Sequence, residues 1–203
     1  MHRSAMLRMK WFVDNYVPRD KEVKVLDIGS YDVNGCYRPL FKETKAEYIG
    51  LDLEKGPNVD FVPNDPYLWS ELEDDSFDFI ISGNAFEHIE YPWLTITEIY
   101  KKLKHGGVCC ILAPFAHVEH RYPVDCYRYF SDGLIALAKW GGLKVIEATV
   151  GGVPKGNTDP EWTNPNLNYD DSMLVAAKLN PGESIEGYPK FGNTKLTKRW
   201  IDC

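Results

Sequence analysis

The sequence predicts an α/β protein built on a mostly parallel sheet with helices on both faces. Two observations lead to this prediction. Short apolar runs with strand character alternate with amphipathic segments along the chain. No internal repeat, low-complexity tract or long linker divides the 203 residues, which favours a single main domain.

The first half of the chain opens on a helix and continues with four strands. Apolar residues from Met6 to Tyr16 share one helical face, which predicts a helix over residues 4–17. A weaker helical pattern follows the first strand, over residues 37–43. The four strands are expected over residues 23–28, 48–53, 59–62 and 77–82.

The second half of the chain adds two helices and three strands. Ile96, Ile99 and Leu103 lie at helical spacing, which predicts a helix over residues 93–103. No convincing helix separates the last two strands, so we expect them to pair as an antiparallel edge. The remaining elements are a helix over residues 131–140 and strands over residues 108–112, 143–150 and 173–179. Seven strands in this pattern predict a Rossmann-like sheet.

Composition and charge limit the classes of protein that fit. We expect one domain over residues 1–179 and a polar C-terminal tail over residues 180–203. The net charge of −7 argues against a nucleic-acid partner, because binding phosphates requires positive charge. No apolar run is long enough to span a membrane. Five cysteines without metal-binding spacing, together with the lack of a signal peptide, predict reduced thiols and a cytoplasmic protein.

The end of the first strand carries the strongest indication of a ligand. Asp27 and Gly29 lie at its carboxyl end, which in a doubly wound sheet borders the ligand crevice. Asp52, at the end of the second strand, is placed to accept hydrogen bonds from ribose hydroxyls. A nicotinamide-dependent dehydrogenase is disfavoured, because Tyr31 and Val33 replace the glycines that cradle a pyrophosphate.

Several further segments carry a family resemblance in combination. They are D-S-F-D-F-I-I-S at residues 75–82, F-E-H-I at 86–89, L-K-H-G-G at 103–107 and Y-F-S-D-G-L at 129–134. Together with the turn after the first strand and Asp52, this pattern resembles the small class I S-adenosylmethionine-dependent methyltransferases of the type 11 domain. The resemblance covers roughly residues 23–179.

The resemblance implies S-adenosylmethionine as cofactor, S-adenosylhomocysteine as product, and a set of cofactor-binding residues. Asp27, Gly29 and Ser30 would border the methionine part. At Tyr31, where many members carry glycine, either the loop is longer than in the family or Tyr31 covers the cofactor. Asp52 would hold the ribose and Leu53 would pack against the adenine. The remaining implied contacts are Asn64 and Asp65 at the adenine amino group, and Ser82, Gly83 and Asn84 beside the reactive methyl group.

Methyl transfer depends mainly on holding acceptor and methyl group at attack distance, and a general base adds to the rate. The candidates for that base are His88, His117 and His120. The spacing of His117, His120 and Asp125 would also suit a divalent ion, but no further ligand is apparent, so we predict no metal. The candidate substrate residues are Arg121, Asp125, Tyr127 and Trp162, with Trp162 in a possible lid over residues 151–171 and Arg128 as a structural anchor to Asp125.

The predicted acceptor is a small polar molecule. By analogy with compact family members, we favour a hydroxyl of a sugar or sugar phosphate in surface-polysaccharide or natural-product biosynthesis. The alternative is a protein that binds S-adenosylmethionine or another nucleoside without catalysis. A homodimer is a further possibility.

Overall fold

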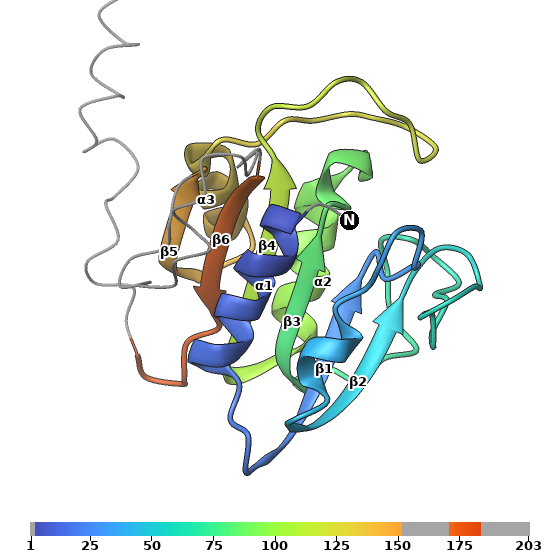
Figure 1. Cartoon of the computed structure of the whole chain (residues 1–203). Coiled ribbons are helices and arrows are strands. Elements are labelled where there is room, and N and C mark those ends of the chain that lie inside the picture. Colours follow the sequence, from blue (N-terminus) through green and yellow to red (C-terminus); the bar gives the residue numbers. More distant parts are fainter. Residues whose placement is uncertain (1–2, 152–170, 184–203) are drawn as a thin grey trace, which may run out of the picture.

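The computed structural model describes residues 3–151 and 171–183. Within them six strands form one sheet in the order β2-β1-β3-β4-β6-β5 (Figure 1). The strands are β1 (Glu22–Ile28), β2 (Lys45–Leu51), β3 (Phe77–Gly83), β4 (Leu103–Pro114), β5 (Lys144–Val150) and β6 (Asp171–Ala177). The helices are α1 (Arg3–Tyr16), α2 (Pro92–Lys102) and α3 (Ser131–Trp140), with short 3-10 turns η1 (Arg38–Phe41) and η2 (Phe86–His88).

Helices cover both faces of this sheet, as the sequence predicts. Helix α1 buries Met9 and Phe12 against one face, in a core that includes Val25. Helices α2 and α3 bury Ile96 and Leu134 in the core on the opposite face. Each such side chain contributes roughly 1.5–3 kcal/mol by leaving water. This three-layer arrangement leaves the ends of the strands as the place where loops meet.

The last two strands pair antiparallel, which confirms the predicted pairing, but their position in the sheet differs from the prediction. Strand β6 is antiparallel to both of its neighbours, β4 and β5. The antiparallel strand therefore lies inside the sheet, and β5 forms the edge. Because β6 runs against the other strands, its first residue, Asp171, pairs with Pro114 at the end of β4. A residue from late in the chain thus joins the carboxyl edge of the parallel strands.

The predicted strand at residues 59–62 is wrong, and among the described residues the sheet has six strands rather than seven. This segment makes a single bridge to β2, between Leu51 and Phe61. The Asp60 carboxylate accepts the Gly50 N–H at 2.7 Å. The Asp60 side chain therefore occupies a backbone N–H of β2 next to the bridge. Pro57 and Pro63, on either side of the segment, have no N–H to donate to a neighbouring strand.

The predicted helices are confirmed to within a residue or two, and 37–43 forms only the short turn η1. Strand β4 begins earlier than expected. The predicted turn at Gly106 and Gly107 lies inside the strand, where the pairing with β3 is irregular. None of the helices in the part of the chain that is described is long and apolar enough to cross a membrane. Trp162, most of the predicted lid and residues 184–203 of the predicted tail lie outside the described residues.

Candidate active site

Four segments that are distant in sequence meet at the carboxyl edge of the parallel strands. The turn after β1 contacts the loop after β3, since Gly29 faces Ala85. The loop after β4 is tied to the same place, because the backbone N–H groups of Cys126 and Tyr127 donate to the Glu87 carbonyl at 2.7 and 3.2 Å. At the start of β6, Asp171 accepts a hydrogen bond from Asn84 Nδ2 at 2.9 Å. The segments form one continuous site.

Gly29 is required in this turn for two independent reasons. Its φ of +75° lies in the left-handed region, and a Cβ atom there would lie 2.3 Å from the Ala85 Cβ. We expect Gly29→Ala to destabilise the protein by about 2–3 kcal/mol, through backbone strain and the clash. Denaturant unfolding would measure this loss. Gly133→Ala is the matched control, because Gly133 lies in α3 with its nearest neighbour 3.7 Å away. That helical position should gain about 0.5–1 kcal/mol, and equal stability of the two variants would contradict the assignment.

Asp27 presents a buried carboxylate at the end of β1. The residue is only 2% exposed, and its Oδ1 atom accepts no hydrogen bond. The Tyr48 hydroxyl donates to Oδ2. Burial raises the pKa of Asp27 to about 7, against the lowering effect of this hydrogen bond. An acceptor atom without a partner at this depth suits a ligand that brings an ammonium group.

Asp52 shapes the loop that follows β2. Its two oxygens accept hydrogen bonds from the backbone N–H groups of Tyr31, at 2.9 Å, and Leu53, at 2.7 Å. Each carboxylate oxygen keeps a second acceptor position, so binding of a ribose diol stays open. The Tyr31 ring packs against Gly56, where a Cβ atom would come within 2.2 Å of the ring. Tyr31 therefore lies over the loop after β2, and Leu53 is exposed beside it.

The other predicted cofactor residues also lie at this edge of the sheet. Ser82 is buried and donates to the Ile28 carbonyl, so its hydroxyl joins β3 to β1. Gly83 lies against the Tyr37 ring and hydroxyl. Asn64 and Asp65 lie beyond the bridge to β2 and are exposed. Ser30, also buried, donates to the Asn58 carbonyl at 3.3 Å.

The most unusual group in the site is a buried carboxylate that faces two imidazoles. Glu87 is 1% exposed, and neither of its side-chain oxygens accepts a hydrogen bond. Its Oε1 lies 3.7 Å from His88 Nε2 and 3.9 Å from His120 Nε2. Burial raises the pKa of Glu87 to about 8 and lowers the pKa of His88. The structure therefore places two of the three predicted histidines beside Glu87, and His117 meets His120 edge to face with ring centroids 4.6 Å apart.

The loop between β4 and α3 is held by one ion pair. Arg128 binds both oxygens of Asp125, at 2.5 and 2.7 Å, and donates to the carbonyls of His117 and Val118. Asp125 also accepts the His120 N–H at 2.7 Å. The Arg128 guanidinium holds the pKa of Asp125 well below its usual range. Arg128 is thus the anchor that the sequence predicted, and Asp125, predicted to contact substrate, fixes the backbone of the histidine segment.

Two other predicted substrate residues, Arg121 and Tyr127, differ in whether their side chains bond to the rest of the fold. The Arg121 side chain is exposed and pairs with Glu119, also exposed, at 2.7 Å. The Tyr127 hydroxyl donates to the Glu90 carbonyl at 2.9 Å. Arg121 can therefore turn to a ligand at little cost, whereas Tyr127 helps to position the loop.

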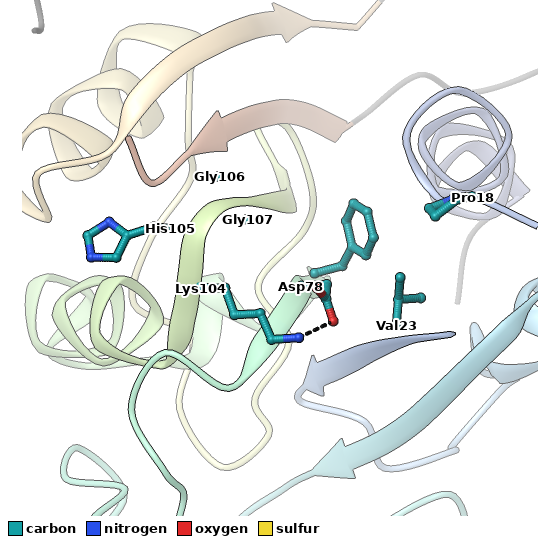
Figure 2. Close-up of a pocket in the computed structure, with 8 residues that line it drawn as sticks. Pro18, Val23, Asp78, Lys104, His105, Gly106 and Gly107 are labelled. Atoms are coloured by element: carbon teal, nitrogen blue, oxygen red, sulfur yellow. Dashed lines mark hydrogen bonds and ion pairs between the residues drawn. The ribbon is translucent and has the colours of Figure 1, made fainter. Parts of the chain in front are cut away.

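A cavity of about 250 Å³ lies at the opposite, amino edge of the strands (Figure 2). Its lining includes Val23, Asp78 and Lys104. Figure 2 shows the Lys104 ammonium on the Asp78 carboxylate, at 2.8 Å, and the Lys24 N–H donates to the same oxygen. The charged groups there satisfy each other, so the cavity offers no reactive group comparable to Glu87 or Asp27.

Sequence reasoning missed three members of the site. Glu87 drew attention only as the neighbour of His88, because nothing in the sequence shows that its carboxylate is buried. Tyr48 lies within a strand whose pattern gives no hint of its bond to Asp27. Asp171 enters the site only because β6 runs antiparallel, and the hydroxyl of Ser4 in α1 donates to it at 2.8 Å.

Comparisons with known proteins agree with this geometry. A family model described as a methyltransferase domain matches residues 26–111. No curated protein matches the sequence. Several solved structures share the fold. An S-adenosylmethionine-dependent methyltransferase from Archaeoglobus fulgidus is 17% identical, with a TM-score of 0.61 over 85% of this chain and 94% of that chain.

Two further structures widen the range of substrates and partners among the neighbours. Phosphoethanolamine N-methyltransferase 2 from Haemonchus contortus, in complex with S-adenosylmethionine, is 17% identical with a TM-score of 0.61 over 85% of this chain and 53% of that chain. A Haloferax volcanii protein in complex with the Trm112 methyltransferase activator is 18% identical, with a TM-score of 0.59 over 87% and 96% of the two chains.

Residues 26–111 thus resemble a methyltransferase domain, and the chain shares the fold of S-adenosylmethionine-dependent methyltransferases. This resemblance points to S-adenosylmethionine as the methyl donor. The residues present fit that cofactor, because Asp27 offers a buried acceptor atom without a partner at the carboxyl end of β1. Asp52 offers further acceptor positions. When bound, the cofactor supplies an electrophilic methyl group on a sulfonium.

Proposed function

We propose that the protein transfers a methyl group to a hydroxyl of a small polar acceptor, a sugar or sugar phosphate. The observation that supports this most strongly is the group formed by Glu87, His88 and His120 at the carboxyl edge of the parallel strands. A hydroxyl loses its proton on methylation, and a neutral imidazole is suited to accept a proton near neutral pH. Once ionised, Glu87, whose Oε1 lies 3.7 and 3.9 Å from the two imidazole Nε2 atoms, stabilises the resulting imidazolium.

The surrounding backbone determines which imidazole nitrogen is available. His88 Nδ1 lies 2.6 Å from the Val124 carbonyl, and His120 Nδ1 lies 3.1 Å from the Val118 carbonyl. A carbonyl only accepts hydrogen bonds, so these contacts require the proton on Nδ1. Each Nε2 then carries the free electron pair on the side that faces Glu87. Arg128 and Asp125 keep the His120 backbone in place.

The choice of a sugar phosphate depends on Arg121. Its guanidinium is exposed. Among the described residues its ion-pair partner is Glu119, two positions earlier in the chain and also exposed. An arginine in this position binds a phosphate or carboxylate in a bidentate manner. Sugar phosphates carry both the hydroxyl and the anion, which is why we prefer them. Surface-polysaccharide or natural-product biosynthesis is the setting we propose for such an acceptor.

Calorimetric titration with S-adenosylmethionine, S-adenosylhomocysteine and NAD tests the cofactor site directly. We expect binding of the first two and none of NAD. An acceptor screen that begins with sugar phosphates then follows methyl transfer by mass spectrometry. Cofactor binding without turnover on any hydroxyl acceptor would favour the alternative, a binding protein without catalysis.

Asp52→Ala should weaken S-adenosylmethionine binding by about 1–3 kcal/mol, because the variant lacks the hydrogen bonds that a carboxylate makes to a ribose. Calorimetry at constant pH measures this change. Asp60→Ala is a control, since Asp60 supports the same end of β2 through Gly50 and Arg38 without facing the crevice turn. Unchanged affinity in a folded Asp52→Ala variant would contradict the ribose assignment.

The remaining proposals concern the setting of the enzyme. We propose one catalytic domain over residues 1–179, a cytoplasmic location, and action as a monomer or homodimer without nucleic acid. Sedimentation of the purified chain would measure the oligomeric state.

A further inference from the structure

We propose that Glu87, His88 and His120 form a binding site for a divalent transition-metal ion of the Zn²⁺ type. Their ligand atoms, one from each residue, lie within 4.8 Å of one another. Two imidazoles and one carboxylate are a frequent ligand set for such ions in enzymes. Sequence spacing directed attention to His117, His120 and Asp125 instead, but the structure commits the Asp125 carboxylate to Arg128.

The first argument for a ligand is the state of Glu87. It is 1% exposed, and both carboxylate oxygens lack a hydrogen bond. A buried carboxylate without a partner is costly, so folded proteins keep one where a cation or a donor completes it. The two Nε2 atoms stand at 3.7 and 3.9 Å from Oε1, beyond hydrogen-bond distance.

The second argument is the spacing of these atoms. Bonds of about 2.0–2.2 Å to a tetrahedral Zn²⁺ place neighbouring ligand atoms roughly 3.4 Å apart. The two separations from Glu87 Oε1 exceed that value by a few tenths of an ångström, and all three ligand atoms lie within 4.8 Å of one another, so side-chain rotations can bring them to one ion. A direct hydrogen bond between the same groups would need a larger movement.

The third argument is the second layer of contacts. Metal-bound histidines usually donate their other ring N–H to a carbonyl or carboxylate, which fixes the ring. His88 and His120 both have Nδ1 on a backbone carbonyl, of Val124 and Val118. Both Nε2 electron pairs are thereby directed to the face that Glu87 occupies. The backbone N–H groups of Cys126 and Tyr127 fix the Glu87 main chain in turn.

Three protein ligands leave a coordination position for an oxygen ligand. A bound ion lowers the pKa of such an oxygen, so an acceptor hydroxyl could ionise there without an imidazole base. This role in acceptor binding rests on the proposed function. Binding of the ion does not, since it can be measured in the absence of cofactor and acceptor.

The test uses the full-length protein, freed of metal by a chelator, at pH 7.5. Competition with a fluorescent chelator measures the affinity for Zn²⁺, with Mg²⁺ as the comparison ion. We expect one tight Zn²⁺ site per chain and at least a hundredfold weaker binding in Glu87→Gln and His120→Ala. His105→Ala is the matched control, because His105 lies at the amino edge and bonds to the Leu179 carbonyl. It should bind Zn²⁺ like the wild type.

Two results would overturn the site. One is Zn²⁺ affinity in Glu87→Gln and His120→Ala equal to that of the wild type. The other is a thiolate-to-metal charge-transfer band in the Co²⁺-loaded protein, which would place the ion on a cysteine such as Cys36 or Cys126. Circular dichroism and S-adenosylmethionine binding show whether each variant is folded. Normal cofactor binding and methyl transfer in the presence of chelator would overturn the role of the ion in acceptor activation and leave the proposed function standing.

Discussion

Asp27→Asn is expected to make the ligand-free protein more resistant than the wild type to rising pH. The pKa of Asp27 is raised from 3.8 to about 7, mainly by burial. The native state therefore holds this proton at pH values where the unfolded chain has released it. Wild-type stability from this group is fully present below pH 4, falls as pH rises towards 7, and is constant above that. The total loss is about 4 kcal/mol, of which about 3 kcal/mol falls between pH 5 and pH 8.

Thermal unfolding at pH 5 and pH 8 measures this effect, because asparagine cannot titrate. The difference in Tm between Asp27→Asn and wild type should grow in favour of the variant by several degrees from pH 5 to pH 8. Asp78→Asn is the control, since Asp78 is only partly buried and paired with Lys104. A pH-independent difference between Asp27→Asn and wild type would show that the Asp27 carboxyl is not held protonated in the fold.

The same substitution should weaken S-adenosylmethionine binding. An amide lacks the charge that pairs with the ammonium of the methionine part, and hydrogen bonds to charged groups contribute about 1.5–3 kcal/mol. Calorimetry at pH 8 would therefore show roughly 10- to 150-fold weaker binding. If Asp27→Asn is more stable than the wild type but binds S-adenosylmethionine more weakly, the buried carboxylate of Asp27 is retained for ligand binding rather than for stability.

The sequence predicted those parts of the fold that depend on local pattern. The helix over residues 131–140 and the strands at residues 23–28 and 77–82 are periodic and closed by turn residues, so tertiary packing had little to change. The segment at residues 59–62 has strand-like composition, but it lies at a sheet edge where Asp60 takes the Gly50 N–H. Whether a side chain or a neighbouring strand takes this N–H depends on the three-dimensional arrangement, which the local sequence does not specify.

The candidate site shows the same division. Asp27, Gly29 and Asp52 were identifiable because each lies at a strand end, where parallel topology gathers ligand-binding residues. The role of Glu87 depends on burial and on the approach of His120, which comes from 33 residues further along the chain and is placed by the Arg128–Asp125 pair. No spacing rule contains that information, so His88 and His120 could be named as candidates but not as a pair.

His120→Ala and His88→Ala are expected to reduce turnover by about 10²- to 10⁴-fold while leaving S-adenosylmethionine affinity unchanged. The factor is what a positioned proton acceptor contributes. Neither ring contacts Asp27, Gly29 or Asp52 in the hydrogen bonds described above, so cofactor binding should not change. Steady-state kinetics on the acceptor found by the screen, paired with calorimetry on each variant, separates the two effects.

His105→Ala again serves as control, with turnover expected to equal the wild type. A chelator distinguishes the two ways in which the histidines can act. If they accept the proton themselves, turnover in chelator is unchanged. If they hold an ion, chelator lowers turnover to the level of the variants and Zn²⁺ restores it in the wild type only. Full turnover in both His88→Ala and His120→Ala would contradict either role and leave His117, which meets His120 edge to face, as the remaining predicted base.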